Sequence, residues 1–215
     1  REKNKIEIVR SPIFLAHSSR KYRGIEEFEY ITTSTFSFTL EDLKEMYVYA
    51  WSIQVFHSLG IFEYLSKYYN KVYNLPYIEF FDQFLTFCKT ENSMFSKEYE
   101  RAVNHANKGY SGDGWNDYDP QFGELNWPFE ESSFLRMIQS KEKLFDGITE
   151  FLAYLEHKNN YESKSDILKD LTKFQIFLLT TRDDLQDIKS EEFNYNWKNF
   201  SVENEILKSE VSNYF

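Results

Sequence analysis

The stretch TLEDLKEMYVYAWSIQVFHSLGIFEYLSKYYN, which runs from Thr39 to Asn70, decides the fold. Thr39 followed by Asp42 is a capping-box pattern, in which the threonine oxygen accepts from a free amide and the positive helix end stabilises the acid. After Lys44 the sequence is apolar on nearly every side, which is typical of a central helix that other helices cover. We therefore predict a central helix here, with Trp51 buried at its middle.

The second half of this stretch carries polar interruptions and a glycine. Gln54 and His57 interrupt the apolar run, which is in any case too short to span a bilayer. Gly60 ends or bends the helix, and Ile61–Tyr69 starts a second helical pattern at a new angle. A polar pair on an apolar helix must find partners. The simpler interpretation is that His57 is a core histidine bonded to a carbonyl or to Gln54, and the alternative is a contact with a ligand or substrate.

The composition is that of a folded, acidic chain of 215 residues, long enough for one good-sized domain or two small ones. The 21 Phe, 16 Tyr and 4 Trp make up 19% of the residues, and such aromatic density is typical of a packed core and not of disorder. The net charge of −10 argues against a nucleic-acid surface, which needs clustered Lys and Arg. With Cys88 as its single cysteine, the chain cannot form an internal disulfide, which favours a cytoplasmic location.

The patterns outside the central stretch predict a mainly α-helical fold, a single helical domain over 1–215 with a small β element made from its N- and C-terminal segments. Residues 1–38 form a β-containing arm, 39–180 the helical core, and 190–200 a C-terminal strand that pairs with the arm and ties the chain ends together. Besides the central pair, the expected helices cover Pro76–Lys89, Ser93–Gly109, Pro128–Lys158 and Ser163–Leu179. The chain opens on Arg1 directly into a strand-like run, so we expect it to be a piece of a longer protein.

Gly109–Glu131 is the least helical stretch of the chain, and it is acidic, aromatic and rich in glycine. Long loops inside compact domains are more often functional than others. We hypothesise that this loop is ordered, that Trp115 and Trp127 fold it onto the helices, and that it forms a concave aromatic site beside His57. Its acidic and amide side chains suggest calcium, but their spacing is not that of an EF-hand and a solvated turn is favoured. These residues are Asp113, Asn116, Asp117 and Asp119.

The remaining chemistry-bearing residues predict no catalytic constellation and no metal site. His17 lies in a loop beside Ser18, but adjacency in sequence is not the geometry of a catalytic triad. His105 and His157 lie near helix ends, where ordinary surface roles suffice. No metal-ligand spacing, GxGxxG motif or phosphate loop is present in the sequence. Cys88 falls on the aromatic face of its helix and is interpreted as a buried hydrophobe.

Six segments form a recognisable order along the chain. They are RSPIFLAHSS (10–19), FEYITTSTFSFTLEDLKEM (28–46), WSIQVFHSLGIFEYLSKYYN (51–70), LPYIEFFDQF (75–84), FGELNWPFEESSFL (122–135), and FQIFLLTTRDD followed by EEFNYNW (174–197). This order resembles the region that follows the radical S-adenosylmethionine (SAM) barrel in a group of bacterial cobalamin-binding-type radical SAM proteins. The resemblance covers nearly the whole chain and rests on aromatic and structural residues.

The resemblance implies a non-catalytic C-terminal accessory region that covers the open end of the barrel and helps to shape the substrate pocket. Its partner would be the radical SAM barrel upstream in the same polypeptide. The parent would carry a 4Fe-4S cluster and S-adenosylmethionine, and the resemblance also allows cobalamin. The present chain has neither the CxxxCxxC loop of the cluster nor the Asp-x-His-x-x-Gly motif of cobalamin, so we expect no cofactor in it.

The resemblance also suggests which residues lie nearest the substrate, although it assigns them no established role. It points to His17, His57, Trp115 and Trp127, and we add Gln54 as the polar neighbour of His57.

Two rival functions remain, and whether the protein is itself an enzyme is left open. The first rival is a stand-alone helical interaction module of unknown function, with the loop Gly109–Glu131 as its contact surface. The second is an independent enzyme, which the lack of a catalytic constellation disfavours. Cysteines at cluster spacing upstream of Arg1 in the encoding reading frame favour the accessory region, and a start codon near Arg1 favours the module.

Overall fold

The computed structural model describes residues 5–20, 26–179, 190–203 and 205–206, and it is mainly α-helical, as the sequence predicts. The helices are α1 (Leu40–Ile53), α2 (Glu63–Tyr73), α3 (Tyr77–Thr90), α4 (Met94–Ser111), α5 (Phe129–Ile138), α6 (Lys141–Asn159), α7 (Ser165–Leu178) and α8 (Trp197–Glu203). The strands β1 (Glu7–Pro12) and β2 (Phe28–Ser34) pair antiparallel into a two-stranded sheet. Parts of the predicted arm, core and tail that fall on 1–4, 21–25, 180–189, 204 and 207–215 lie outside the described residues.

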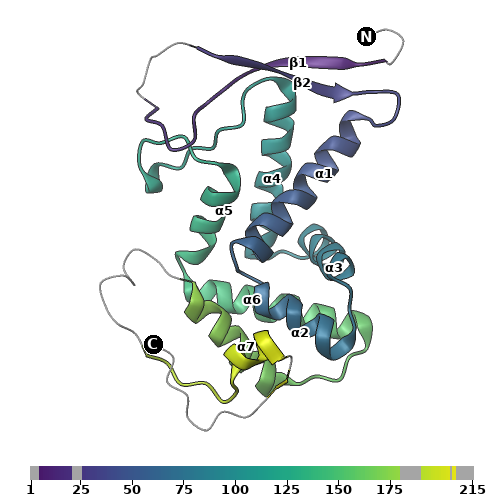
Figure 1. Cartoon of the computed structure of the whole chain (residues 1–215), viewed down its shortest axis with the longest axis vertical. Coiled ribbons are helices and arrows are strands. Elements are labelled where there is room, and N and C mark those ends of the chain that lie inside the picture. The colour runs from purple at the N-terminus through teal and green to yellow at the C-terminus, as the bar shows by residue number, and fades with distance from the viewer. Residues whose placement is uncertain (1–4, 21–25, 180–189, 204, 207–215) are drawn as a thin grey trace.

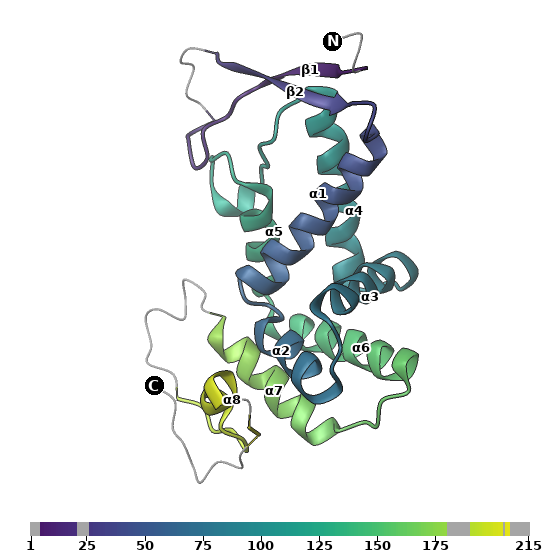
Figure 2. The same cartoon turned by 45° about the vertical axis from the view of Figure 1, so that its right-hand side comes forward.

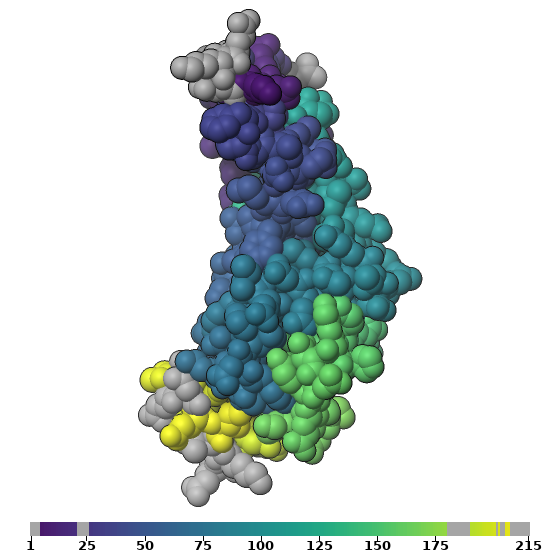
Figure 3. Space-filling model, turned by 90° about the vertical axis from the view of Figure 1, so that its right-hand side faces the viewer, coloured from purple at the N-terminus to yellow at the C-terminus, as the bar shows by residue number. Residues whose placement is uncertain are grey.

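The elements are arranged along an elongated body (Figures 1 and 2). At one end the β1–β2 sheet lies across the start of α1 and the end of α4, which run side by side. At the other end α2, α6 and α7 pack together, and α8 lies beside α7. The space-filling view places the N-terminal strands and the C-terminal helix at opposite ends of the molecule (Figure 3).

The start and the bend of the central helix follow from its residues. The Thr39 hydroxyl accepts from the Asp42 N–H at 3.2 Å, and the Asp42 carboxylate accepts from the Thr39 N–H at 2.7 Å, so the predicted capping box is confirmed. After α1 the backbone widens into a π-helical turn over Gln54–Ser58. The chain then turns at Gly60, whose φ of +95° is a conformation that a residue with a side chain rarely adopts. The predicted change of direction is therefore confirmed.

The junction between α1 and α2 leaves backbone groups without helical partners, and a glutamine of α7 satisfies them. The Gln175 side-chain oxygen accepts from the Tyr64 N–H at 2.7 Å, and its amide donates to the Gly60 carbonyl. Gln175 is 1% exposed. Because unpaired buried backbone groups are costly, this side chain holds the bend in place.

Aromatic rings from several helices meet in the core between the two groups of helices. The Phe56 and Phe84 rings lie 4.4 Å apart, and the Phe62 ring stacks on Phe151 at 5.4 Å. All four side chains are fully buried, and Trp51 is 2% exposed, which confirms its predicted burial. The high aromatic content of the sequence is thus used mainly for packing.

The single helix predicted over Pro128–Lys158 is wrong, because the structure has two helices there, α5 and α6. Ser140 has an extended backbone, and its hydroxyl accepts from the Lys143 N–H at 3.4 Å as the N-cap of α6. The apolar stripe continues across this break, so hydrophobic periodicity alone does not reveal it.

The C-terminal strand predicted over 190–200 is also wrong, since α8 begins inside it at the end of the molecule opposite β1 and β2 (Figure 1). Asp170 of α7 accepts from backbone amides of this segment and from the Trp197 indole N–H at 2.8 Å, so those amides are not available to a strand partner. Burial falls on Phe193, Trp197 and Phe200. Their spacing of four and three residues is helical, whereas the alternation of Phe193, Tyr195 and Trp197 in the sequence is typical of a strand. The chain ends are not tied together by this segment.

Candidate ligand-binding site

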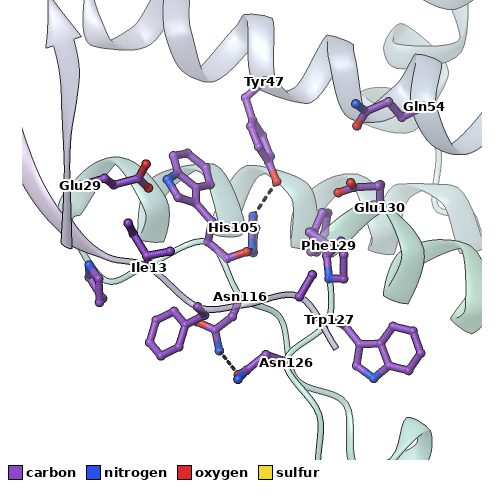
Figure 4. Close-up of a pocket in the computed structure, with 15 residues that line it drawn as sticks. Ile13, Glu29, Tyr47, Gln54, His105, Asn116, Asn126, Trp127, Phe129 and Glu130 are labelled. Atoms are coloured by element: carbon purple, nitrogen blue, oxygen red, sulfur yellow. Dashed lines mark hydrogen bonds between the residues drawn. The ribbon is translucent and has the colours of Figure 1, made fainter. Parts of the chain in front are cut away.

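A hollow of about 410 Å³ lies between the N-terminal arm, α1, α4 and the loop that joins α4 to α5 (Figure 4). Its volume is within the usual range of small-molecule pockets, about 300–1,000 Å³. Ile13 and Glu29 come from the arm, Tyr47 from α1, His105 from α4 and Trp115 from the loop. The hollow therefore brings together segments that are far apart in the sequence.

His105 is the fixed centre of one wall of the hollow. The side chain is buried, and its ring stacks on Phe129 with the ring centres 4.4 Å apart. Its Nε2 lies 3.2 Å from the Trp115 carbonyl oxygen, and its Nδ1 lies 2.7 Å from the Tyr47 hydroxyl (Figure 4). Because a carbonyl oxygen only accepts, Nε2 carries the ring hydrogen and Nδ1 accepts from the Tyr47 O–H. Both ring nitrogens are therefore satisfied.

The same burial keeps this pair uncharged at neutral pH. Burial lowers the pKa of His105 to about 4; the charge of Asp117 acts in the opposite direction, and that of Lys108 lowers the pKa further. Burial also raises the pKa of Tyr47, and the negative charge of Glu130 adds to this rise. At neutral pH the wall of the hollow presents a neutral imidazole and a neutral phenol.

We expect the protein to lose stability as the pH falls from about 6.5 to about 4, and a His105→Phe variant to lose less. The histidine binds a proton near 6.5 in the unfolded chain and near 4 in the folded one. In that window protons bind only the unfolded state, so the contribution of His105 is fully present above 6.5 and is lost as the pH falls to about 4. The shift corresponds to about 3 kcal/mol. Urea unfolding at a series of pH values measures it, and parallel curves for the two proteins would contradict the assignment.

Trp115 attaches the loop to the helices, as the sequence analysis predicts. Its ring lies over Gly109 of α4, where an added Cβ would come within 2.3–2.5 Å of three ring atoms. The ring also lies 5.2 Å from Tyr47 and meets Tyr110 edge-on at 4.9 Å. The glycine is therefore required by the close approach of the indole to the helix backbone.

Gly109→Ala is expected to destabilise the protein by about 1–3 kcal/mol, the usual cost of overpacking. This loss would occur although alanine is the better helix former by about 1 kcal/mol. Gly147→Ala in α6 is the matched control, because an added Cβ there first meets the flexible side chain of Met94 at 3.0 Å. Thermal unfolding and tryptophan fluorescence compare the two variants. Equal stability of both would show that Trp115 does not need the close contact.

His17 and Trp127 pair with each other on the N-terminal arm, and only Trp127 lines the hollow. Their rings meet edge-on at 5.0 Å, and His17 Nε2 lies 2.7 Å from a carboxylate oxygen of Glu131, in an exposed pair. Ser18 accepts from the Asn126 side-chain amide at 3.0 Å and is not paired with His17, which argues against nucleophilic chemistry here. Trp127 was expected to pack on the helices, but its ring contacts are with His17 of the arm and with Phe122 of the loop itself.

His57 lies outside the hollow, so its predicted place beside the loop is wrong. Its Nδ1 is 3.3 Å from the Ser66 hydroxyl, and its ring meets the edges of Tyr77 and Phe81. The interpretation as a packed histidine is correct, but its partner is a serine and not a carbonyl or Gln54. Gln54 is exposed and lines the hollow.

The acidic loop is not simply a solvated turn, because two of its three aspartates, Asp117 and Asp119, bind an arginine. Arg136 Nη1 lies 2.9 Å from Asp117 and 3.8 Å from Asp119, and Arg136 Nη2 lies 3.0 Å from Glu98. Three of these side chains are nearly buried, and Asp117 is half-buried. Across the part of the chain that the structure describes, no group of three His, Cys, Asp or Glu residues is placed to hold a metal ion. The network holds the loop against α4 and α5.

Sequence reasoning missed four residues that define the hollow: Glu29, Tyr47, His105 and Glu130. A signal for His105 was present, because it follows Ala102 by three residues on the buried face of α4. Its position near the helix end instead favoured the interpretation as an ordinary surface histidine. The two glutamates have no local signal, since a strand and the first turn of α5 meet only in the tertiary fold.

In the comparisons with known proteins, no family model matches the chain, and no curated protein matches it significantly. The resemblance to radical SAM proteins therefore remains an expectation. Among the described residues, no helix is both long enough and apolar enough to cross a bilayer.

Proposed function

We propose that this chain is a non-catalytic recognition domain whose hollow helps to shape the substrate site of a larger enzyme. In line with the sequence resemblance, we propose a cytoplasmic radical SAM protein as that enzyme, with its barrel upstream in the same polypeptide. The observation that supports the proposal is the hollow with its preset wall. His105 is bonded to both Tyr47 and the backbone of Trp115, and preorganisation of this kind lowers the cost of binding.

The state of the wall favours recognition over acid–base chemistry. The Nε2 hydrogen of His105 is bound to a carbonyl, and its Nδ1 lone pair accepts from Tyr47. A general base needs a free lone pair within reach of the substrate proton, and a general acid needs a proton to give. This histidine offers neither, and its role in the proposal is to hold Tyr47 and Trp115 in place.

Filling the hollow should abolish binding of small probes. Ile13→Trp adds bulk at a lining position, and Ile78→Trp on α3 is the matched control because Ile78 is 62% exposed and does not line the hollow. Ligand-observed NMR with 2-phenylethylammonium, 2-phenylethanol and phenylacetate should show binding of at least one probe to the wild type and the control but not to Ile13→Trp. Binding that Ile13→Trp leaves unchanged, or no binding at all, would contradict a ligand site here.

The encoding reading frame tests the proposed parent separately. Coding sequence with cysteines at CxxxCxxC spacing upstream of Arg1 is the expected result. A start codon immediately before this position, with no such cysteines upstream, would contradict the radical SAM assignment and leave the hollow to be tested by itself.

The stand-alone interaction module stays a second candidate because of apolar side chains on and next to the N-terminal arm. Leu15 is 76% exposed, Tyr30 71% and Phe36 77%, and exposed apolar side chains are available to contact a partner protein. A photo-crosslinker at position 36 should then capture one protein from cells, while one at the exposed Ile78 should not. Capture that also persists in the Ile13→Trp variant would favour the module over the ligand site.

A further inference from the structure

The charged side chains that line the hollow are all of one sign. Glu29 from β2 and Glu130 from the first turn of α5 line it, and the lining contains no Lys or Arg. Among the described residues, neither carboxylate has a hydrogen-bonding or ion-pair partner. Arg136, the nearly buried cation of α5, is occupied by Glu98 and Asp117. Two carboxylates without partners thus face one cavity.

The two carboxylates lie on either side of Tyr47 in the view of Figure 4, and the charge of Glu130 acts on the Tyr47 hydroxyl. In Figure 4 the Glu29 and Glu130 side chains both point inward, with Tyr47 between them. The Tyr47 O–H is donated to His105 Nδ1, so toward the hollow its oxygen presents lone pairs only. The polar groups around this point therefore accept hydrogen bonds and do not donate them.

The other polar groups of the hollow do not change this balance. The His105 N–H is bound to the Trp115 carbonyl, and the Asn116 amide donates to Asn126 at 3.1 Å. The Trp127 indole N–H lies on the far side of its ring from Tyr47 (Figure 4). Gln54 offers both a donor and an acceptor and does not select for charge. An occupant must therefore bring donors, and a positive charge would be attracted by both glutamates.

The apolar part of the lining limits what else the occupant carries. Pro12, Ile13 and Phe14 of the arm and Pro128 before α5 contribute apolar surface to the hollow. The Phe129 ring is stacked on His105, so that face is not available to a cation, whereas the acceptor oxygens of Glu29, Glu130 and Tyr47 are.

We propose that the hollow takes an organic ammonium ligand, with its N–H groups bound between Glu29, Glu130 and the Tyr47 oxygen and its short apolar body against the arm. This inference rests on the proposed function, and it adds the charge class of the ligand. The net charge of the chain, −10, favours the approach of such a ligand at low salt.

Three probes of matched shape test the inference on the full chain. By calorimetry near neutral pH, 2-phenylethylammonium should bind at least about tenfold more tightly than neutral 2-phenylethanol, and phenylacetate should bind most weakly. The preference should shrink at high salt. It should disappear in the Glu29→Gln/Glu130→Gln variant and persist in Glu79→Gln, a control at an exposed glutamate of α3 that does not line the hollow.

A charge reversal keeps the test decisive if the double variant folds poorly. Glu29 is exposed, so Glu29→Lys should fold normally and shift the preference toward phenylacetate. Equal binding of the ammonium and the alcohol, or an ammonium preference that survives both the double variant and Glu29→Lys, would overturn the inference but leave a ligand site. No binding of any probe would overturn the proposed function together with the inference.

Discussion

We expect replacement of Trp51 by alanine to lower the free energy of unfolding by about 3–5 kcal/mol, as for other large buried aromatic residues. The side chain is 2% exposed, meets Phe56 edge-on at 5.6 Å, and donates its indole N–H to the Ser133 hydroxyl at 3.1 Å. The alanine variant loses the packing and the hydrogen bond together. Equilibrium unfolding in urea, followed by circular dichroism, measures the loss.

Trp51→Phe separates the two contributions. It keeps most of the aromatic volume but removes the bond to Ser133, which is worth about 1 kcal/mol. Its loss should therefore be smaller than that of the alanine variant. A loss below about 1 kcal/mol for Trp51→Ala would mean that α1 is peripheral and not the central helix.

Arg136→Ala is expected to be as severe, at about 3–5 kcal/mol, because it leaves buried carboxylates without a counter-charge. Arg136 is 10% exposed and reaches Glu98, Asp117 and Asp119. Arg101→Ala is the matched control, since Arg101 also pairs with Glu98, at 3.4 Å, but is 57% exposed. An exposed pair contributes about 0–1 kcal/mol, so equal losses in the two variants would contradict a buried network.

The difference between Arg136→Ala and the wild type should shrink in acid. Although burial raises the pKa of Asp117, the hydrogen bonds from Ser132 and Arg136 outweigh it and hold the pKa below its usual value. A carboxyl with a lowered folded pKa stabilises the protein above its unfolded pKa of about 3.9, and this stability is lost as the pH falls through the folded pKa. Urea unfolding of both proteins from neutral to acidic pH checks this, and a constant difference would exclude Asp117 as the partner that matters.

Local signals predicted the parts of this fold that depend on neighbouring residues. The capping box at Thr39, the bend at Gly60 and the cap at Ser93 each need only a few adjacent side chains, and all are present. The predicted C-terminal strand depended on what the segment would meet. Asp170 binds its amides, and no pattern within 190–200 reveals a partner on another helix.

The candidate site was predicted in part, and the histidines show why. When a helix is apolar on nearly every side, its sequence does not show which side is buried. The buried side of α1 could therefore not be distinguished from the side that carries Met46, which is 64% exposed. His57 was therefore assigned to the wrong surroundings. Trp115 was assigned correctly because a tryptophan in a glycine-rich loop has few alternatives to packing. The place of His105 in the site could not be predicted, because it depends on the loop returning over the end of α4.

The dependence of the α1–α2 junction on Gln175 has a consequence for how the chain folds during synthesis. The groups that this side chain satisfies, on Gly60 and Tyr64, are 115 and 111 residues earlier in the sequence. Contacts of such long range form late, because the intervening chain must first be ordered. While the ribosome is still making α3 to α6, the aromatic faces of α1 and α2 have emerged but their bend has no partner. The rings of α3 to α6 can cover these faces as they emerge, but the backbone groups of the bend stay without their partner until α7 leaves the ribosome.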